Sequence, residues 1–383
     1  MVKALILIFS TFFISFFVIW IIIRFSHLHE RVTADNDLHG KQKFHAKPVP
    51  RIGGVGVVLA MAGFAILFFL LEGKSAQSYF FLWVVSIPAF MIGFVEDITK
   101  RVSPMWRLIG VMVAAAMGIV LLNARLERLD ILGVDILMQI AAVSVIFTLF
   151  AVAGVANAIN IIDGYNGLAG GVTCLIFAGL AYAGWRVSDH LVTYTSISMI
   201  CALIGFLIWN FPRGLIFLGD GGAYFVGFMI GELSVLLLAR NPTISACYPL
   251  VLCSYPVFET LFSIYRKKYI RGRSPGQPDG VHMHMLIYKR FVRLHAYAKD
   301  TDAKTWRNSI TSIYLWALAG SSVVPAMIFW DSPFVLWVLF AAFCLAYLRL
   351  YWAIVKFRHP DWMELTPDEP DARQSLQFQE KAK

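Results

Sequence analysis

Four polar side chains stand at intervals of three residues at the end of a long apolar stretch. Asn157, Asn160, Asp163 and Asn166 follow this stretch and precede another. Because successive helical residues are rotated by about 100°, each lies about 60° from the one before, so a helix would carry all four on one broad face. Two glycines in the same stretch would let the backbone approach a ligand closely. A polar helix cap followed by a turn is the alternative, and this stretch alone does not decide between them.

A pair of adjacent carboxylates follows an earlier apolar stretch. Glu96 and Asp97 precede Lys100 and Arg101. Two neighbouring acids at the end of a membrane helix are electrostatically costly unless a metal ion or cations offset them. The pair therefore indicates either a polar site or an ordinary C-terminal turn capped by the two cations.

A further acid, Asp220, stands among glycines immediately before another apolar stretch. Hard oxygen ligands of this kind suit magnesium, which usually binds one or two carboxylates together with substrate phosphates. Phe217 lies three residues earlier, near enough for its ring to stack on a base, and Asn210 begins the same loop. The alternative for Asp220 is an N-cap of the following helix.

Cations and histidines occupy two other loops. Lys47 and Arg51 lie on a segment stiffened by two prolines and suit the charge of a diphosphate, although positive loops beside membranes are common. His282 and His284 lie in the longest cationic loop; their spacing of two favours an extended segment that binds phosphate or only adds solubility. No cysteine or third well-spaced histidine accompanies them, so zinc is not expected.

The composition requires a membrane to position these residues. Of 383 residues, 58% are hydrophobic and 15% charged. We predict an all-α polytopic membrane protein with about eleven transmembrane helices around a cytoplasmic-face cleft. The net charge of +9 is assigned to loops beside an anionic leaflet and not to nucleic acid. The predicted spans are 4–23, 55–71, 79–95, 108–124, 138–158, 168–185, 191–209, 221–239, 244–265, 309–330 and 333–355.

The distribution of charge predicts an orientation. The loops that follow the first, third, fifth, seventh and ninth predicted spans are called the odd-numbered loops. Together with the C-terminal tail they hold most of the 33 Lys and Arg residues. The positive-inside rule then places these loops and the C-terminus in the cytoplasm and the N-terminus outside. All the polar motifs fall in odd-numbered loops, as an enzyme at the membrane surface requires. We expect one integral-membrane domain at 1–355 and a polar tail at 356–383.

Taken together, the five loops between about residues 40 and 290 resemble the polyprenyl-phosphate N-acetylhexosamine-1-phosphate transferase superfamily. Members transfer a sugar 1-phosphate from a UDP-amino sugar to a polyprenyl phosphate such as undecaprenyl phosphate, releasing UMP, and need Mg²⁺, for which Mn²⁺ can substitute. The resemblance implies an enzyme of the bacterial inner membrane, with a cytoplasmic active site and a periplasmic N-terminus. It implies the initiating step of a lipid-linked surface glycan such as O-antigen, and leaves a homodimer open.

The resemblance also implies roles for individual residues. Asp220 matches the main metal ligand, and Asp163 a second residue beside the metal and diphosphate. Asp97, the second acid of the pair, matches a residue that deprotonates or positions the acceptor phosphate, and Glu96 is assigned with it to the catalytic residues. Substrate-binding roles fall on Lys47, Arg51, Asn157, Asn166, Asn210, Phe217, His282 and His284, and Asn160 helps to shape the catalytic centre.

Departures from the family pattern narrow the range of expected donor substrates. Many relatives have two aspartates where this chain has Glu96 and Asp97, and Asn166 replaces a common aspartate. The run His-Met-His-Met lacks the consecutive histidines of the peptidoglycan branch, which favours a UDP-amino sugar smaller than the muramoyl-pentapeptide donor. N-acetylglucosamine is expected, with N-acetylfucosamine and N-acetylquinovosamine as alternatives. A transporter of nucleotide sugars or lipid-linked sugars is the competing function.

Overall fold

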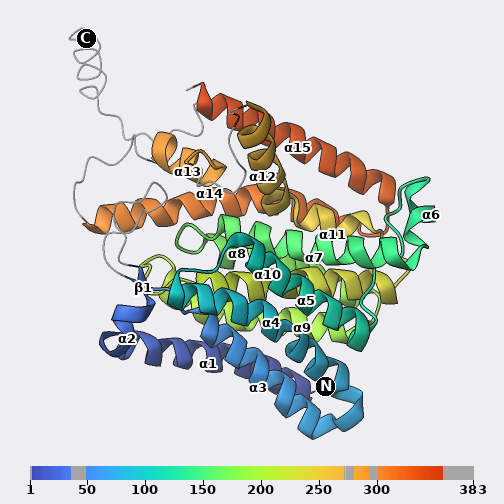
Figure 1. Cartoon of the computed structure of the whole chain (residues 1–383), viewed down its shortest axis with the longest axis horizontal. Helices are drawn as coiled ribbons and strands as arrows, with labels where there is room; N and C mark the ends of the chain where they lie inside the picture. The colour runs from blue at the N-terminus through green and yellow to red at the C-terminus, as the bar shows by residue number, and fades with distance from the viewer. Residues whose placement is uncertain (1, 36–48, 271, 273–279, 293–300, 357–383) are drawn as a thin grey trace.

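The structure, a computed structural model, describes residues 2–35, 49–270, 272, 280–292 and 301–356. Within these residues the only strands are β1 (Ala34–Asp35) and β2 (Val49–Pro50), which pair antiparallel with Ala34 opposite Pro50. Everything else that is regular is helical (Figure 1). The tail predicted at 356–383 lies outside the described residues except for its first residue.

The helices have the following bounds: α1 (Val2–Arg24), α2 (Ser26–Thr33), α3 (Gly54–Glu72), α4 (Gln77–Thr99), α5 (Pro104–Leu122), α6 (Val134–Met138), α7 (Ala141–Ile162), α8 (Leu168–Arg186), α9 (His190–Asn210), α10 (Gly219–Arg240), α11 (Cys247–Leu252), α12 (Ser254–Tyr265), α13 (Met283–Leu286), α14 (Thr301–Ile328) and α15 (Pro333–Val355).

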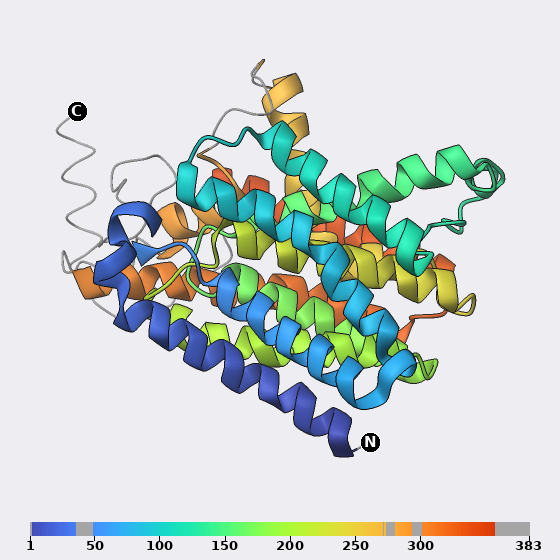
Figure 2. The same cartoon turned by 60° about the horizontal axis from the view of Figure 1, so that its bottom comes forward.

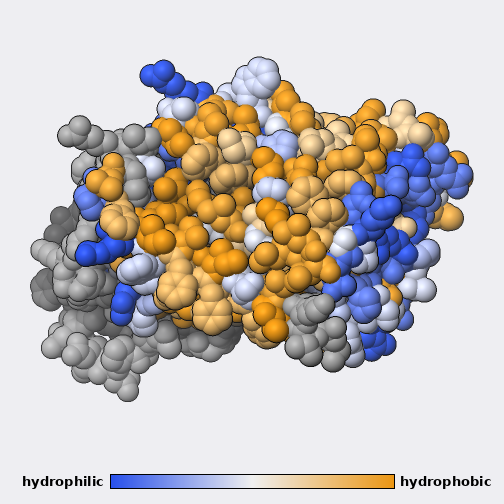
Figure 3. Space-filling view, turned by 90° about the horizontal axis from the view of Figure 1, so that it is seen from below, coloured by the Kyte–Doolittle hydropathy of each residue, from blue (hydrophilic) through white to orange (hydrophobic). Residues whose placement is uncertain are grey.

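Most of these helices have the length and composition of membrane spans. Nine stretches of the described chain are helical and apolar enough to cross a bilayer, and one of them, Gly54–Thr99, contains both α3 and α4. Figure 3 shows the apolar side chains as a broad central band that gives way to hydrophilic residues at one end of the molecule. Helices suit this environment because each satisfies its own backbone hydrogen bonds in the absence of water. The prediction of an all-α, multi-pass membrane protein is confirmed.

The number of spans differs in one place from the expected eleven. The stretch predicted at 244–265 forms two short helices, α11 and α12, instead of one long one. A count of eleven is therefore not confirmed. The predicted orientation and the cleft on the cytoplasmic face stay predictions.

Helix α10 is the central element of the bundle. Of the 18 most apolar consecutive residues of α10, 89% are buried inside the protein. The helix packs against α3, α4, α5, α7, α8 and α9. Glycines allow some of these approaches: a Cβ atom added to Gly54 of α3 would lie 2.3 Å from the Cα atom of Gly222 of α10. The N-terminus of α10 is thereby held against the beginning of α3.

One end of the bundle gathers the polar segments. Helices α2 and α13 lie at this end, and the N-terminus of the chain lies at the other (Figures 1 and 2). The ends of α4 and α7 and the beginnings of α5 and α10 meet here, because side chains from all four hydrogen-bond across the same point. Residues far apart in sequence thus reach one place.

Candidate active site

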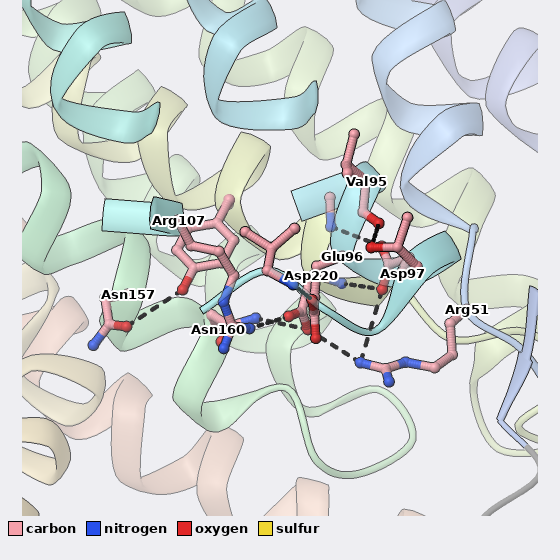
Figure 4. Close-up of polar contacts among 12 residues, drawn as sticks. Arg51, Val95, Glu96, Asp97, Arg107, Asn157, Asn160 and Asp220 are labelled. Carbon is pink, nitrogen blue, oxygen red and sulfur yellow. Dashed lines mark hydrogen bonds and ion pairs between the residues drawn. The ribbon is translucent and has the colours of Figure 1, made fainter. Parts of the chain in front are cut away.

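The Asp220 carboxylate, in the first turn of α10, lies at the centre of the polar cluster where α4, α5, α7 and α10 meet (Figure 4). Its Oδ1 atom accepts hydrogen bonds from Arg51 Nη2 at 3.1 Å and from Asn160 Nδ2 at 3.2 Å. Its Oδ2 atom accepts from Nη1 of Arg107, which lies in the first turn of α5. Two cations and one amide therefore converge on one buried acid, as charge neutrality at a buried position requires.

Asp97 holds the helix that carries Asp220. Its two carboxylate oxygens accept from the backbone N–H groups of Asp220 at 2.9 Å and Gly221 at 2.8 Å. The Asp97 side chain is buried, and Arg51 Nη2 lies 3.7 Å from its Oδ1. Leu218, at the N-cap of α10, makes no side-chain cap, so the free N–H groups of this helix are satisfied from α4. The cap is thus supplied by Asp97 and not by Asp220.

Asp163 ends α7 close to the same centre. Burial and the negative charge of Asp220 raise the pKa of the Asp163 carboxyl to about 7, and Arg51 opposes the shift. Among the described residues, none donates a hydrogen bond to this carboxylate. Asp163 is therefore a second acid beside Asp220 that keeps its oxygens available.

The predicted helix face is correct only in part. Helix α7 ends at Ile162, so Asn166 lies in the following turn and does not share a helix face with the others. The glycine beside Asn166, Gly167, has φ +78° and ends the turn. Asn160 contacts the central acid, whereas Asn157, one turn deeper, accepts a hydrogen bond from Tyr224 Oη at 3.4 Å.

The polar groups of Asn166 and Asn210 form hydrogen bonds with other parts of the protein. The Asn166 side chain donates to the carbonyl oxygen of Pro212 at 3.2 Å, and its backbone N–H donates to Asn308 Oδ1 of α14 at 2.7 Å. Asn210 accepts from the backbone N–H of Gly167 at 2.6 Å. These contacts join the two loops on which nucleotide binding was expected, and that role stays a prediction.

The acidic pair divides between two tasks. Asp97 accepts hydrogen bonds from the backbone of α10. Glu96 instead accepts a hydrogen bond at its Oε2 atom from the backbone N–H of Val102, at 2.6 Å, in the loop that follows α4. Lys100 adopts φ 54° at the end of α4, which completes a tight turn. Glu96 thus shapes the loop between α4 and α5, and no contact among the described residues assigns it to the centre.

The two histidines lie beside the turn that follows α7. Their rings are parallel, with centroids 5.2 Å apart, and the His284 ring meets Tyr165 edge-on at 5.4 Å. A Cβ atom added to Gly164 would lie 3.7 Å from His284 Nε2. His282 has the expected extended conformation, but His284 belongs to the short helix α13.

Several expected residues have other placements. Lys47 lies outside the described residues. Both backbone polar groups of Phe217 are hydrogen-bonded. Its N–H donates to the carbonyl oxygen of Pro50 at 2.8 Å, and its carbonyl oxygen accepts from the N–H of Gly53 at 2.9 Å. This pairing holds Arg51, between them, against the beginning of α10.

Sequence reasoning missed two residues of this region. Arg107 was counted only as a topological charge, although its place shortly after the acidic pair could have marked it. Glu259 of α12 is completely buried and contacts His282. A carboxylate within an apolar stretch is rare, and that signal could have found Glu259.

The oxygen donors of the centre fit a hard divalent cation that takes few protein ligands. No group of three or more acidic, histidine or cysteine side chains is placed to hold a metal among the described residues. Magnesium, however, typically uses one or two carboxylates and completes its shell with water and substrate phosphates. A carboxylate has about four acceptor positions, and three donors reach Asp220, so one acceptor position of Asp220 remains for a cation.

Comparison with known proteins identifies relatives along most of the chain. The profile of "Glycosyl transferase family 4" matches residues 79–238. A Bacillus subtilis protein named probable undecaprenyl-phosphate N-acetylglucosaminyl 1-phosphate transferase is 28% identical over 314 residues, covering 79% of this chain and 81% of the relative. An Escherichia coli O157:H7 undecaprenyl-phosphate alpha-N-acetylglucosaminyl 1-phosphate transferase is 27% identical, covering 82% and 84%. A Mycolicibacterium smegmatis decaprenyl-phosphate N-acetylglucosaminephosphotransferase is 27% identical, covering 75% and 74%.

Proposed function

The chain belongs to the superfamily of polyprenyl-phosphate N-acetylhexosamine-1-phosphate transferases, and on this premise we propose its reaction. It transfers an N-acetylated amino-sugar 1-phosphate, GlcNAc-1-phosphate in the first instance, from the UDP-sugar to undecaprenyl phosphate. The products are undecaprenyl-diphosphate-sugar and UMP. This reaction would begin a lipid-linked surface glycan such as O-antigen.

The observation that carries the proposal is the convergence on Asp220. Arg51, Arg107 and Asn160 reach its carboxylate from three other segments, and Asp97 binds the backbone beneath it. Transfer between two phosphates needs cations that offset several negative charges, and positioned groups that align the reacting atoms. The site has both, at one end of a membrane bundle where a lipid phosphate can meet a soluble nucleotide.

The chain's own residues would act mainly on charge and position. An oxygen of the lipid phosphate attacks the phosphorus that bears the sugar, and the bond from this phosphorus to the UMP oxygen breaks with its electron pair leaving on UMP. Arg51 and Arg107 would exchange part of their contact with Asp220 for the phosphates of the substrates. The N-terminus of α10 points its partial positive charge at the same place.

Asp220 and Asp163 would hold Mg²⁺, with Mn²⁺ as a substitute. The bound ion supplies charge neutralisation for the donor diphosphate. Asp97 suits positioning better than proton removal, because both of its oxygens already accept backbone hydrogen bonds. A phosphate acceptor is already an anion near neutral pH, so its attack does not depend on a base within the protein.

The nucleotide is proposed to bind beside the loop that carries Phe217, with Lys47 contributing charge. The proposed orientation places this end of the bundle in the cytoplasm, where UDP-sugars are made. The isoprenoid chain of the acceptor would lie among the spans within the bilayer.

Purified protein in detergent tests the proposal directly. It is offered undecaprenyl phosphate, Mg²⁺ and a panel of UDP-sugars that includes UDP-GlcNAc and its 6-deoxy relatives, and the lipid product is identified by mass. Formation of lipid-linked sugar together with UMP supports an enzyme, because a transporter needs a sealed vesicle and makes no new bond. No product with any donor would refute the proposal.

A pair of variants ties the activity to the site. Asp220→Asn keeps the shape of the side chain but removes the charge that holds two arginines, so transfer should fall by two or more orders of magnitude. Asp331→Asn changes an exposed acid between α14 and α15 and should leave the rate unchanged. Equal rates for both variants would contradict the assigned role of Asp220.

A further inference from the structure

A completely buried carboxylate, Glu259 of α12, lies behind the histidine segment. Its Oε1 atom is 2.8 Å from His282 Nδ1. Its Oε2 atom accepts from the backbone N–H of Met283 at 3.1 Å and from Tyr347 Oη of α15. An ionised carboxylate without access to water is costly unless donors surround it, and here three donors from two other segments do so.

This contact defines how His282 is protonated. An ionised carboxylate can only accept hydrogen bonds, so the proton between the two side chains is on His282 Nδ1. The second ring nitrogen, Nε2, is left to interact outward, and no described residue hydrogen-bonds to it. With Nδ1–H donated to Glu259, His282 meets an anion through Nε2, which donates to the anion when it also carries a proton.

The same contact orients the second histidine. Because the rings of His282 and His284 stack in parallel, the position of His282 helps to set the position of His284. His284 in turn packs against Tyr165 and faces Gly164, which follows Asp163. Glu259 is thereby connected, through two rings, to the turn that carries the second acid of the centre.

We propose that Glu259 is a positioning residue that sets the orientation of His282 and His284, so that they present N–H donors to the diphosphate of the donor sugar nucleotide. The proposal rests on the proposed function for the identity of this anion. Glu259 acts only through the histidines and does not touch the substrate itself.

The fold does not depend on this contact alone. Tyr351 of α15 donates from Oη to the carbonyl oxygen of Val281 at 3.2 Å and accepts from Arg266 Nη1 at 3.0 Å. The beginning of the histidine segment is therefore tied to α15 independently of Glu259. A variant at Glu259 is expected to fold, with a loosened histidine pair.

The test combines Glu259→Gln with His282→Ala. Glutamine keeps the size of the side chain, but it loses the charge and one acceptor oxygen. Transfer with UDP-GlcNAc should fall roughly 10- to 100-fold in Glu259→Gln, by analogy with the loss of the hydrogen-bond partner behind a metal-ligating histidine. His282→Ala should cost a similar factor, and the double variant should be no slower than about threefold below His282→Ala, because both changes remove one coupled function.

Glu232→Gln is the matched control. Glu232 of α10 is also a completely buried glutamate, but neither of its oxygens has a hydrogen-bond partner and no histidine adjoins it. The same chemical change there should leave the transfer rate within about twofold of the wild type, the spread expected when no interaction is lost.

Deuterium uptake of residues 281–287 provides a readout that does not need activity. Uptake should rise in Glu259→Gln and stay unchanged in Glu232→Gln, since only the first loses the anchor of this segment. If Glu259→Gln retains the wild-type rate, or if the losses in the double variant simply multiply, the proposal is overturned; unchanged uptake in Glu259→Gln also overturns it. A wild-type protein that makes no lipid-linked product refutes the proposed function instead, and the exchange comparison still decides whether Glu259 anchors the histidines.

Discussion

Asp97→Asn distinguishes a helix cap from a general base. In the structure Asp97 accepts two backbone hydrogen bonds, from Asp220 and Gly221. Asparagine has one acceptor oxygen, so its NH₂ group would face the second N–H donor. Losing one charge-assisted hydrogen bond costs about 1.5–3 kcal/mol, and losing the negative charge at the helix N-terminus about 0.3–1 kcal/mol. Reduced repulsion with Asp220 subtracts from the sum, so we expect a net loss of about 1–3 kcal/mol.

Two measurements on the same protein check this prediction. Unfolding in detergent gives the stability, and Mn²⁺ titration followed by electron paramagnetic resonance gives the affinity for a divalent cation. A cap predicts that Asp97→Asn lowers both, because the N-terminus of α10 moves and takes Asp220 with it. A general base predicts loss of transfer with stability and Mn²⁺ affinity unchanged, and that result would refute our reasoning. Asp331→Asn again provides the control.

Three further predictions concern other positions. Glu232→Met should raise the thermal midpoint in detergent by removing an unpartnered buried carboxyl, which costs about 1–3 kcal/mol; an unchanged or lower midpoint would contradict this. Gly219→Ala should greatly reduce the yield of folded protein, because Gly219 has φ +79° and a Cβ atom there would lie 1.9 Å from the backbone oxygen of Arg51. Gly133→Ala is the control: Gly133 has φ +83° but open space around it, so this change should lower the free energy of unfolding by only about 1–2 kcal/mol. Arg107→Ala should strengthen Mn²⁺ binding and reduce transfer by at least about tenfold, since it removes a cation that competes for the central acid but serves the phosphates; weaker Mn²⁺ binding would count against this exchange.

The arginines at Asp220 offset part of the negative charge of the site before any substrate arrives. Asp97, Asp163 and Asp220 bring three carboxyl groups together, and Arg51 and Arg107 bring two cations. A buried site with an excess of negative charge attracts a divalent cation, and the cations become available to phosphates when the ion binds. The same residues can therefore serve a site with and without its substrates.

Part of the site followed from the sequence because local patterns suffice for it. The acids and amides all stand at the ends of apolar stretches, and such ends must meet water. This reasoning identified Asp97, Asp163 and Asp220, and the structure brings Asp97 into contact with the helix of Asp220. It could not show that Asp97 binds backbone N–H groups, because that contact joins positions 123 residues apart in the chain.

Other residues could not be placed from sequence spacing. A regular spacing of three put Asn166 on a helix face, but the helix ends at Ile162, where a turn satisfies the backbone through α14. Glu259 stood in an apolar stretch with no neighbour to explain it, because its partners, His282 and Tyr347, come from segments 23 and 88 residues away.

The sequence by itself determined that this chain is helical, spans a membrane repeatedly and carries its polar motifs between the apolar stretches. It could do so because hydrophobic length and periodicity are local properties, and a bilayer leaves helices as the solution for each stretch. Only the tertiary structure decided which acid caps α10, which cations face Asp220 and which carboxylate stands behind His282. Those contacts depend on how α4, α5, α7, α10, α12 and α15 pack, and packing is a property of the whole bundle and not of any one segment.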